Sequence, residues 1–201
     1  MLDSTMRRFI DPPLNAAAAA ISKKISANSI TIGGFFIGLI SVYAVAQGRF
    51  ELALACLLLN RLADGLDGAV ARQSAPTDLG AYLDIVSDFL LWSLLPLAFL
   101  FYDMKNAFAA SLLLSSFAMS MTVFLAFAIQ AEKRGTVSEA QGKKGFYYLA
   151  GLAEGTETIA FFALVMLYPA AFAPAALAFA AFVYLSVIGR IIVSMQELKE
   201  R

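Results

Sequence analysis

Six long apolar runs restrict the folds open to this chain more than any other feature. Each has about 20 residues, the length at which a helix crosses the hydrocarbon core of a bilayer. Their bounds are Ile30–Gln47, Leu52–Arg72, Leu79–Phe101, Ala107–Gln130, Tyr147–Tyr168 and Pro174–Met195. The runs are apolar on every face, whereas a helix of a soluble core keeps one polar face. The sequence therefore predicts an all-α integral membrane protein with six transmembrane helices.

Composition supports this prediction and excludes several other classes. Of the 201 residues, 60% are hydrophobic, against about half in soluble domains. The formal net charge is zero, so no electrostatic attraction favours nucleic acid as a partner. Cys56 is the single cysteine, which excludes an internal disulfide and a cysteine metal site. Because the chain has no histidine, acid–base chemistry must fall to aspartate, glutamate or a metal-bound group.

The N-terminal segment, residues 1–27, is polar enough to stay outside the hydrocarbon. Pro12-Pro13 is expected to interrupt it, and Asn15–Ser26 predicts a short amphipathic helix lying on the membrane surface. A solvated arm is the alternative. The predicted organisation is a cytoplasmic or interfacial segment at 1–27 with this N-terminal interfacial helix, followed by one transmembrane domain at 28–201.

The basic residues predict the orientation. With six spans, the N-terminus, the second and fourth connections and the C-terminus share one side of the membrane. Of the 15 lysines and arginines, only Arg49 and Lys105 fall on the other side, and Arg61 lies inside a span. Cytoplasmic loops carry the excess of basic residues, so the first side is predicted to face the cytoplasm.

Four aspartates lie inside the second and third runs: Asp64, Asp67, Asp84 and Asp88. A carboxylate at membrane depth costs about 3 kcal/mol or more, so a cluster of four needs compensation. Arg61 and Arg72 are too few to neutralise them, which leaves a bound cation as the candidate partner. Carboxylate oxygens suit the hard cations Mg²⁺, Mn²⁺ and Ca²⁺.

The spacing of these aspartates predicts that their side chains meet. Asp64 and Asp67 share one helix face, as do Asp84 and Asp88. If residues 75–77 form the turn, the two helices are antiparallel neighbours and the four carboxylates converge. Small residues leave room beside them for a ligand: Gly65, Gly68, Ala69, Ala71, Gly80 and Ala81. The alternative is a polar seam that only joins helices.

The same residues form a longer pattern. Asp64-x-x-Asp67-Gly68-x-x-Ala71-Arg72, then seven residues, then Gly80-x-x-x-Asp84-x-x-x-Asp88 resembles the signature of the CDP-alcohol phosphotransferases. These membrane enzymes make phospholipids by displacing CMP from a CDP-linked donor with an alcohol hydroxyl. The resemblance implies that Asp64, Asp67 and Asp84 bind two divalent cations, Mg²⁺ or Mn²⁺, and that Asp88 completes the site as the general base.

The resemblance also implies a nucleotide site. Gly68 and Arg72 would accommodate the diphosphate and cytidine, together with Ala71 and Gly80 of the same signature. Asn28 and Thr31 resemble an Asn-x-x-Thr element found before the first span in this family, although a helix cap would explain them equally. The expected donor is CDP-diacylglycerol. The expected location is a bacterial inner membrane, with the active site facing the cytoplasm and the protein forming a homodimer.

Candidates for binding the acceptor alcohol come from the last two spans. Glu154 and Glu157 are intramembrane acids, which makes them functional candidates. Hydrogen bonds to neighbouring helices, or pairing with Arg61 or Arg190, would also explain them. Lys143, Lys144 and Arg190 could bind a phosphate, and the lysines could equally be positive anchors. Glycerol 3-phosphate is the default acceptor. The alternative functions are a membrane transporter whose carboxylates carry a cation, and an inactive scaffold.

Overall fold

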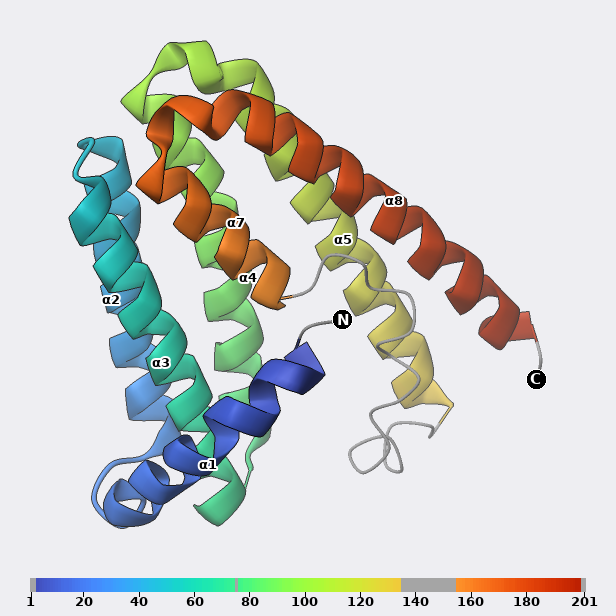
Figure 1. Ribbon diagram of the computed structural model, residues 1–201. Coiled ribbons are helices and arrows are strands. Elements are labelled where there is room, and N and C mark those ends of the chain that lie inside the picture. The colour runs from blue at the N-terminus through green and yellow to red at the C-terminus, as the bar shows by residue number, and fades with distance from the viewer. Residues whose placement is uncertain (1–2, 75, 135–154, 200–201) are drawn as a thin grey trace.

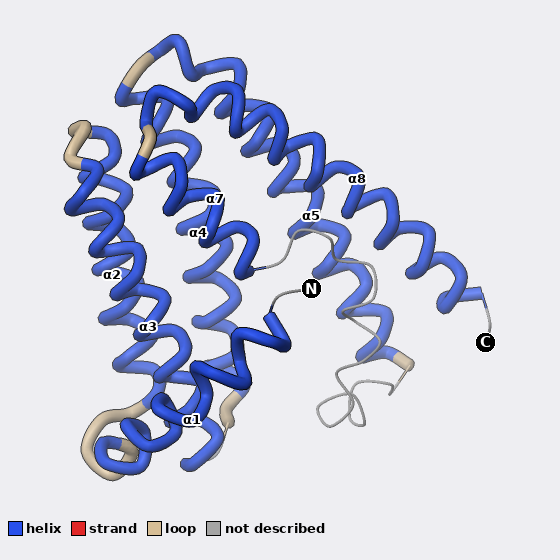
Figure 2. Tube along the Cα trace, in the orientation of Figure 1, coloured by secondary structure: helices blue, strands red, loops and turns tan. Residues whose placement is uncertain are grey.

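The computed structural model describes residues 3–74, 76–134 and 155–199, and this part of the chain is helical with short loops and no strand (Figure 1, Figure 2). The α-helices are α1 (Asp3–Ile21), α2 (Ala27–Ala46), α3 (Phe50–Ser74), α4 (Asp78–Tyr102), α5 (Ala107–Lys133), α7 (Gly155–Leu167) and α8 (Phe172–Lys199). The short 3-10 helices η1 (Met104–Asn106) and η2 (Pro169–Ala171) precede α5 and α8. The all-α prediction is confirmed.

Four helical stretches in the described residues are long and apolar enough to cross a membrane. They are Ala27–Ala46, Asp78–Tyr102, Met104–Lys133 and Pro169–Lys199. α3 is long enough, but its charged side chains, among them Arg61 and Asp64, make it more polar. α7 is described only from Gly155. Helices therefore lie at all six predicted positions, while six complete spans remain a prediction.

The outer surface of these helices is apolar. Large hydrophobic side chains point outward from α2, α4, α5 and α8, among them Phe36, Tyr43, Phe101, Phe108 and Leu185. Soluble monomers rarely expose so many apolar side chains to water, whereas lipid tails would cover them in a membrane. The surface thus agrees with a protein embedded in a membrane.

The connections alternate between two ends of the helix group (Figure 1). The α1–α2 and α3–α4 loops and the C-terminal end of α5 lie at one end, and the α2–α3, α4–α5 and α7–α8 connections lie at the other. This alternation is the one expected for consecutive spans. The end that holds the α3–α4 loop is the one predicted to face the cytoplasm.

α1 differs from the helix predicted for the N-terminal segment. Pro12 and Pro13 lie inside it, so the expected interruption was wrong, and the helix ends at Ile21 rather than Ser26. Each proline removes one backbone donor and crowds the preceding turn, but packing outweighs that local cost. Ala18 is fully buried against Ala69 and Val70 of α3.

α2 packs closely against both α3 and α4, whereas the backbones of α3 and α4 approach each other at few points. α3 and α4 run antiparallel, as expected, and contact each other mainly through their side chains. Glycines let α2 come close: a Cβ on Gly34 would lie 2.8 Å from Ala63 Cβ, and one on Gly38 would lie 3.0 Å from Leu91. Asn60 Nδ2 then donates to the Gly34 carbonyl oxygen at 2.9 Å.

This close approach yields a stability prediction. Gly34→Ala should push α2 away from α3 and lower the free energy of unfolding by about 1–3 kcal/mol, the usual cost of overpacking. Gly33→Ala is the matched control, because its Cβ would meet nothing within 4 Å. Thermal unfolding of the detergent-solubilised chain measures both. Equal melting temperatures for the two variants would contradict the close α2–α3 contact.

The main apolar core lies towards the end opposite the α3–α4 loop. Aromatic rings stack between helices there: Phe99 on Phe172 at 4.1 Å between centroids, and Trp92 on Phe162 at 5.8 Å. The aspartates occupy the other half of α3 and α4, beside α1. The fold therefore places a polar site towards one end of the helix group and supports it with a packed core.

Candidate active site

The structure brings the four signature aspartates together. Asp64 and Asp67 come from α3, and Asp84 and Asp88 come from α4. The carboxyl groups of Asp64 and Asp84 lie beside each other, and the charge of Asp88 acts on both. Convergence across the α3–α4 gap does not need packed backbones, because the side chains themselves span it.

Asp67 is the most enclosed member of the cluster. Its side chain is buried, and Thr31 Oγ1 donates to Asp67 Oδ2 at 2.6 Å. Ser26 is the N-cap of α2, with its side chain accepting from Ser29 N. Asn28 and Thr31 therefore lie inside the helix, and the alternative reading of them as a cap was wrong.

One basic side chain faces the cluster from within α3. Arg61 Nη2 donates to Asp88 Oδ1 at 2.8 Å, and Arg61 Nη1 lies 3.8 Å from Asp64 Oδ2. A single guanidinium cannot balance four carboxylates, so the site carries excess negative charge. Hence the donor set of carboxylates with one hydroxyl, Thr31, fits hard divalent cations. Within the described ranges, no three acidic side chains already stand in a metal-holding arrangement.

A pocket of about 620 Å³ opens beside the cluster at the α3–α4 loop end. Asp67 and Asp84 form part of its wall. All six residues predicted to bind the nucleotide also line it: Asn28, Thr31, Gly68, Ala71, Arg72 and Gly80. These residues come from three helices, so the fold gathers the two halves of the signature and the Asn-x-x-Thr element around one space.

α1 closes one side of this region. Gly65 of α3 receives Leu14 of α1, since a Cβ there would lie 2.6 Å from Leu14 Cδ1. Gln73 Nε2 donates to the Asn15 carbonyl oxygen at 3.0 Å. α1 is thereby fixed against the signature helix, and the loop that follows it adds Lys23 and Lys24 to the pocket wall.

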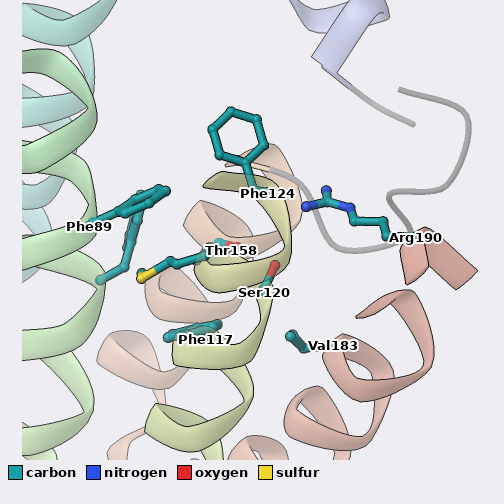
Figure 3. A pocket seen from close by; sticks show the side chains of 10 residues that line it. Phe89, Phe117, Ser120, Phe124, Thr158, Val183 and Arg190 are labelled. Carbon is teal, nitrogen blue, oxygen red and sulfur yellow. The ribbon is translucent and has the colours of Figure 1, made fainter. Parts of the chain in front are cut away.

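A second, smaller cavity of about 190 Å³ lies among α4, α5, α7 and α8 (Figure 3). Its walls are mostly apolar and include several aromatic rings, with the hydroxyls of Ser120 and Thr158 and the guanidinium of Arg190 as polar groups. Figure 3 shows Arg190 reaching from α8 towards the side where Phe124 lies. Of the acceptor candidates, Arg190 therefore lines a cavity.

The other acceptor candidates are only partly described. Glu157 is half-buried in the first turn of α7 and is not among the residues lining either cavity. Lys143, Lys144 and Glu154 lie outside the described residues. An acceptor site formed by these residues therefore stays a prediction.

Comparison with known proteins identifies the family. Residues 24–193 match the CDP-alcohol phosphatidyltransferase family. The chain belongs to this family. The resemblance seen in the sequence is confirmed, and the chain is a CDP-alcohol phosphatidyltransferase of phospholipid synthesis, in preference to a transporter.

Individual relatives agree with the assignment. The chain is 41% identical to the inner membrane protein YnjF of Escherichia coli (strain K12), over 95% of this chain and 94% of that one. It is 28% identical to a phosphatidylcholine synthase of Borreliella burgdorferi, over 43% of this chain and 42% of that one. With its apolar helices, this phosphatidyltransferase is a multi-pass protein of a bacterial inner membrane.

A solved structure shares the fold. It is the Mycobacterium tuberculosis phosphatidylinositol phosphate synthase with CDP-DAG bound, with a TM-score of 0.57 and 19% identity, covering 92% of this chain and 91% of that one. At this identity the likeness establishes the arrangement of helices for the phosphatidyltransferase and no more.

Sequence reasoning missed the residues that frame Asp88 in this phosphatidyltransferase. From the sequence, Arg61 is expected only to offset part of the charge of the aspartates or to pair with a glutamate of the fifth predicted span. In the structure the Arg61 guanidinium lies over the Trp92 ring, 4.8 Å from its centroid. An arginine one turn before Asp64 was a usable signal, but its contact with Asp88, 27 residues away, needed the fold.

Proposed function

We propose that the protein transfers the phosphatidyl group of CDP-diacylglycerol to the hydroxyl of a small polar alcohol and releases CMP. The observation that carries this proposal is the single pocket lined by Asp67, Asp84 and all six nucleotide candidates. A CDP-linked lipid needs such a space beside a charge-stabilising centre at the membrane boundary. The donor bound by the related synthase supports the same choice.

Two divalent cations, Mg²⁺ or Mn²⁺, would be held by Asp64, Asp67, Asp84 and Asp88. When bound, they neutralise charge on the transferring phosphoryl group and on the CMP leaving group. Thr31 orients Asp67 through its 2.6 Å hydrogen bond, so that carboxylate is already positioned before a cation enters.

The remaining steps fall to the chain's own residues. Asp88 accepts the proton of the acceptor hydroxyl, whose oxygen attacks the phosphorus bound to diacylglycerol, and the bond to CMP breaks. Arg72, at the exposed side of the pocket, is placed to pair with the diphosphate. Gly68 and Gly80 keep the backbone accessible to the nucleotide.

Gly80 offers a test of the nucleotide site. A Cβ there would lie 3.0 Å from Asn28 Oδ1 and 3.2 Å from Thr77 Oγ1, tight enough to displace Asn28. Gly80→Ala should therefore raise KM for the CDP-linked donor by about 10-fold, the equivalent of ~1.4 kcal/mol. Gly33→Ala serves as control, since its Cβ meets open space. An unchanged donor KM would remove Gly80 and Asn28 from the nucleotide site.

The acceptor is proposed from charge. Glycerol 3-phosphate is the default, and its dianionic phosphate would need a basic partner such as Arg190, Lys143 or Lys144. Glu154 and Glu157 instead favour a hydroxyl-rich or cationic alcohol. The relatives named phosphatidylcholine synthase support that second class as the alternative. A cytoplasmic active site and a homodimer complete the proposal and rest on the basic-residue bias and the family resemblance.

The experiment is CMP release from CDP-diacylglycerol by the purified full chain with Mg²⁺ or Mn²⁺. Separate reactions contain glycerol 3-phosphate, an inositol phosphate or choline, and mass spectrometry identifies the lipid formed. We expect one alcohol to yield a new phospholipid in step with CMP. The proposal would be overturned if no alcohol led to release of CMP and the protein instead transported a cation into vesicles.

A further inference from the structure

Arg61 is not part of the family signature, yet its side chain is buried beside the signature aspartates. Its side chain is 11% exposed, and each edge of the guanidinium faces a partner. Nη2 donates to Asp88 Oδ1 at 2.8 Å, Nε donates to Asn60 Oδ1 at 2.8 Å, and Nη1 lies 3.8 Å from Asp64 Oδ2. A buried arginine with this many directed contacts is held in one orientation.

The partners of Arg61 are themselves fixed. Asn60 is buried, and its Nδ2 is bound to the Gly34 carbonyl oxygen of α2. The flat face of the guanidinium rests over Trp92 of α4 at 4.8 Å, and Trp92 stacks on Phe162 of α7 with an interplanar angle of 11°. Four helices therefore contribute to the orientation of one guanidinium.

We propose that Arg61 is the positioning residue of this site, holding the Asp88 carboxylate for catalysis and balancing the carboxylate cluster until divalent cations bind. This inference rests on the proposed function, because it presumes that Asp88 takes the acceptor proton. One Asp88 oxygen is occupied by Arg61, which leaves the other for the reaction. The ion pair also joins α3 to α4 where their backbones make few contacts.

The charges of the cluster explain the second role. Without cations, Arg61 is the basic group that contacts Asp64 and Asp88, while Asp67 is bonded to Thr31. Removal of the guanidinium would leave Asp64 and Asp88 without the charge of Arg61, which strongly destabilises a partly buried site. Bound divalent cations would supply the missing positive charge. In a variant without Arg61, bound metal should therefore restore part of the lost stability but should not restore the catalytic rate.

The test uses the full chain in detergent with the variants Arg61→Gln and Arg61→Lys. Arg49→Gln is the control, because Arg49 is an exposed arginine at the opposite end of the helix group. Melting temperature is measured in EDTA and in Mn²⁺, Mn²⁺ binding is measured by electron paramagnetic resonance, and kcat and KM are measured by CMP release.

We expect Arg61→Gln to melt about 10 °C lower in EDTA and to regain at least half of that loss in Mn²⁺, which it still binds. Its kcat should fall about 100-fold from misplacement of Asp88, with the donor KM within about threefold of wild type. Arg61→Lys should recover the melting temperature but only part of kcat, because an ammonium lacks the planar fork.

Three results would overturn the inference: wild-type kcat in Arg61→Gln, a melting loss that is equal in EDTA and Mn²⁺, or absence of Mn²⁺ binding by that variant. The second result would show that Arg61 acts only through packing. If the wild-type chain releases no CMP, the proposed function fails. The Mn²⁺ and melting measurements would still decide whether Arg61 balances the cluster.

Discussion

Asp88→Asn should lower the rate of CMP release by about 10³-fold, within the range that a positioned general base contributes. Asparagine has the same shape, and its amide oxygen can still accept the 2.8 Å hydrogen bond from Arg61. It cannot take a proton from the acceptor hydroxyl. Three aspartates remain to hold cations, so Mn²⁺ and the donor should still bind, more weakly than to the wild type.

Asp103→Asn is the matched control for this variant. Asp103 ends the same helix at the opposite side of the membrane domain and accepts a hydrogen bond from Lys105 N, which asparagine can also do. Its rate should equal that of the wild type. Steady-state CMP release, Mn²⁺ binding and melting temperature are compared for the three proteins. A wild-type rate in Asp88→Asn would show that another group accepts the proton.

The helical fold was largely predictable because hydropathy is a strong local signal. The predicted run Leu79–Phe101 agrees with α4 to within one residue at either end. The N-terminal segment was not predictable in the same way. A local rule keeps proline out of helix interiors, yet Pro12 and Pro13 lie inside α1. The burial of Ala18 against α3 overrides that rule, and this contact is distant in sequence.

The site was predictable to the extent that its residues share one signature. Spacing alone placed Asp64 with Asp67 and Asp84 with Asp88, and the fold gathered both pairs. Spacing could not reveal that the backbones of α3 and α4 approach each other at few points while α2 packs against both. Nor could it reveal a cavity whose lining is drawn from four helices, since Phe117 and Val183 carry no chemical signal of their own.

Removal of divalent cations is the second large effect. Chelation with EDTA should lower CMP release by about 10³-fold or more, because metal charge stabilises a phosphoryl transition state by several kcal/mol. Mg²⁺ or Mn²⁺ should restore the rate. The chelated protein should stay folded, because the hydrogen bonds from Arg61 to Asp88 and from Thr31 to Asp67 do not require a cation. Activity and melting temperature are therefore expected to respond differently to EDTA.

A pair of variants ties this requirement to the cluster. Asp84→Asn removes one carboxylate from the pocket wall and should raise the Mn²⁺ concentration that gives half the maximal rate. Asp78→Asn alters an exposed aspartate of the same helix that does not line the pocket, and its Mn²⁺ dependence should match the wild type. Full turnover in EDTA, or equal Mn²⁺ dependence in both variants, would mean that the excess negative charge of these carboxylates serves something other than cation binding.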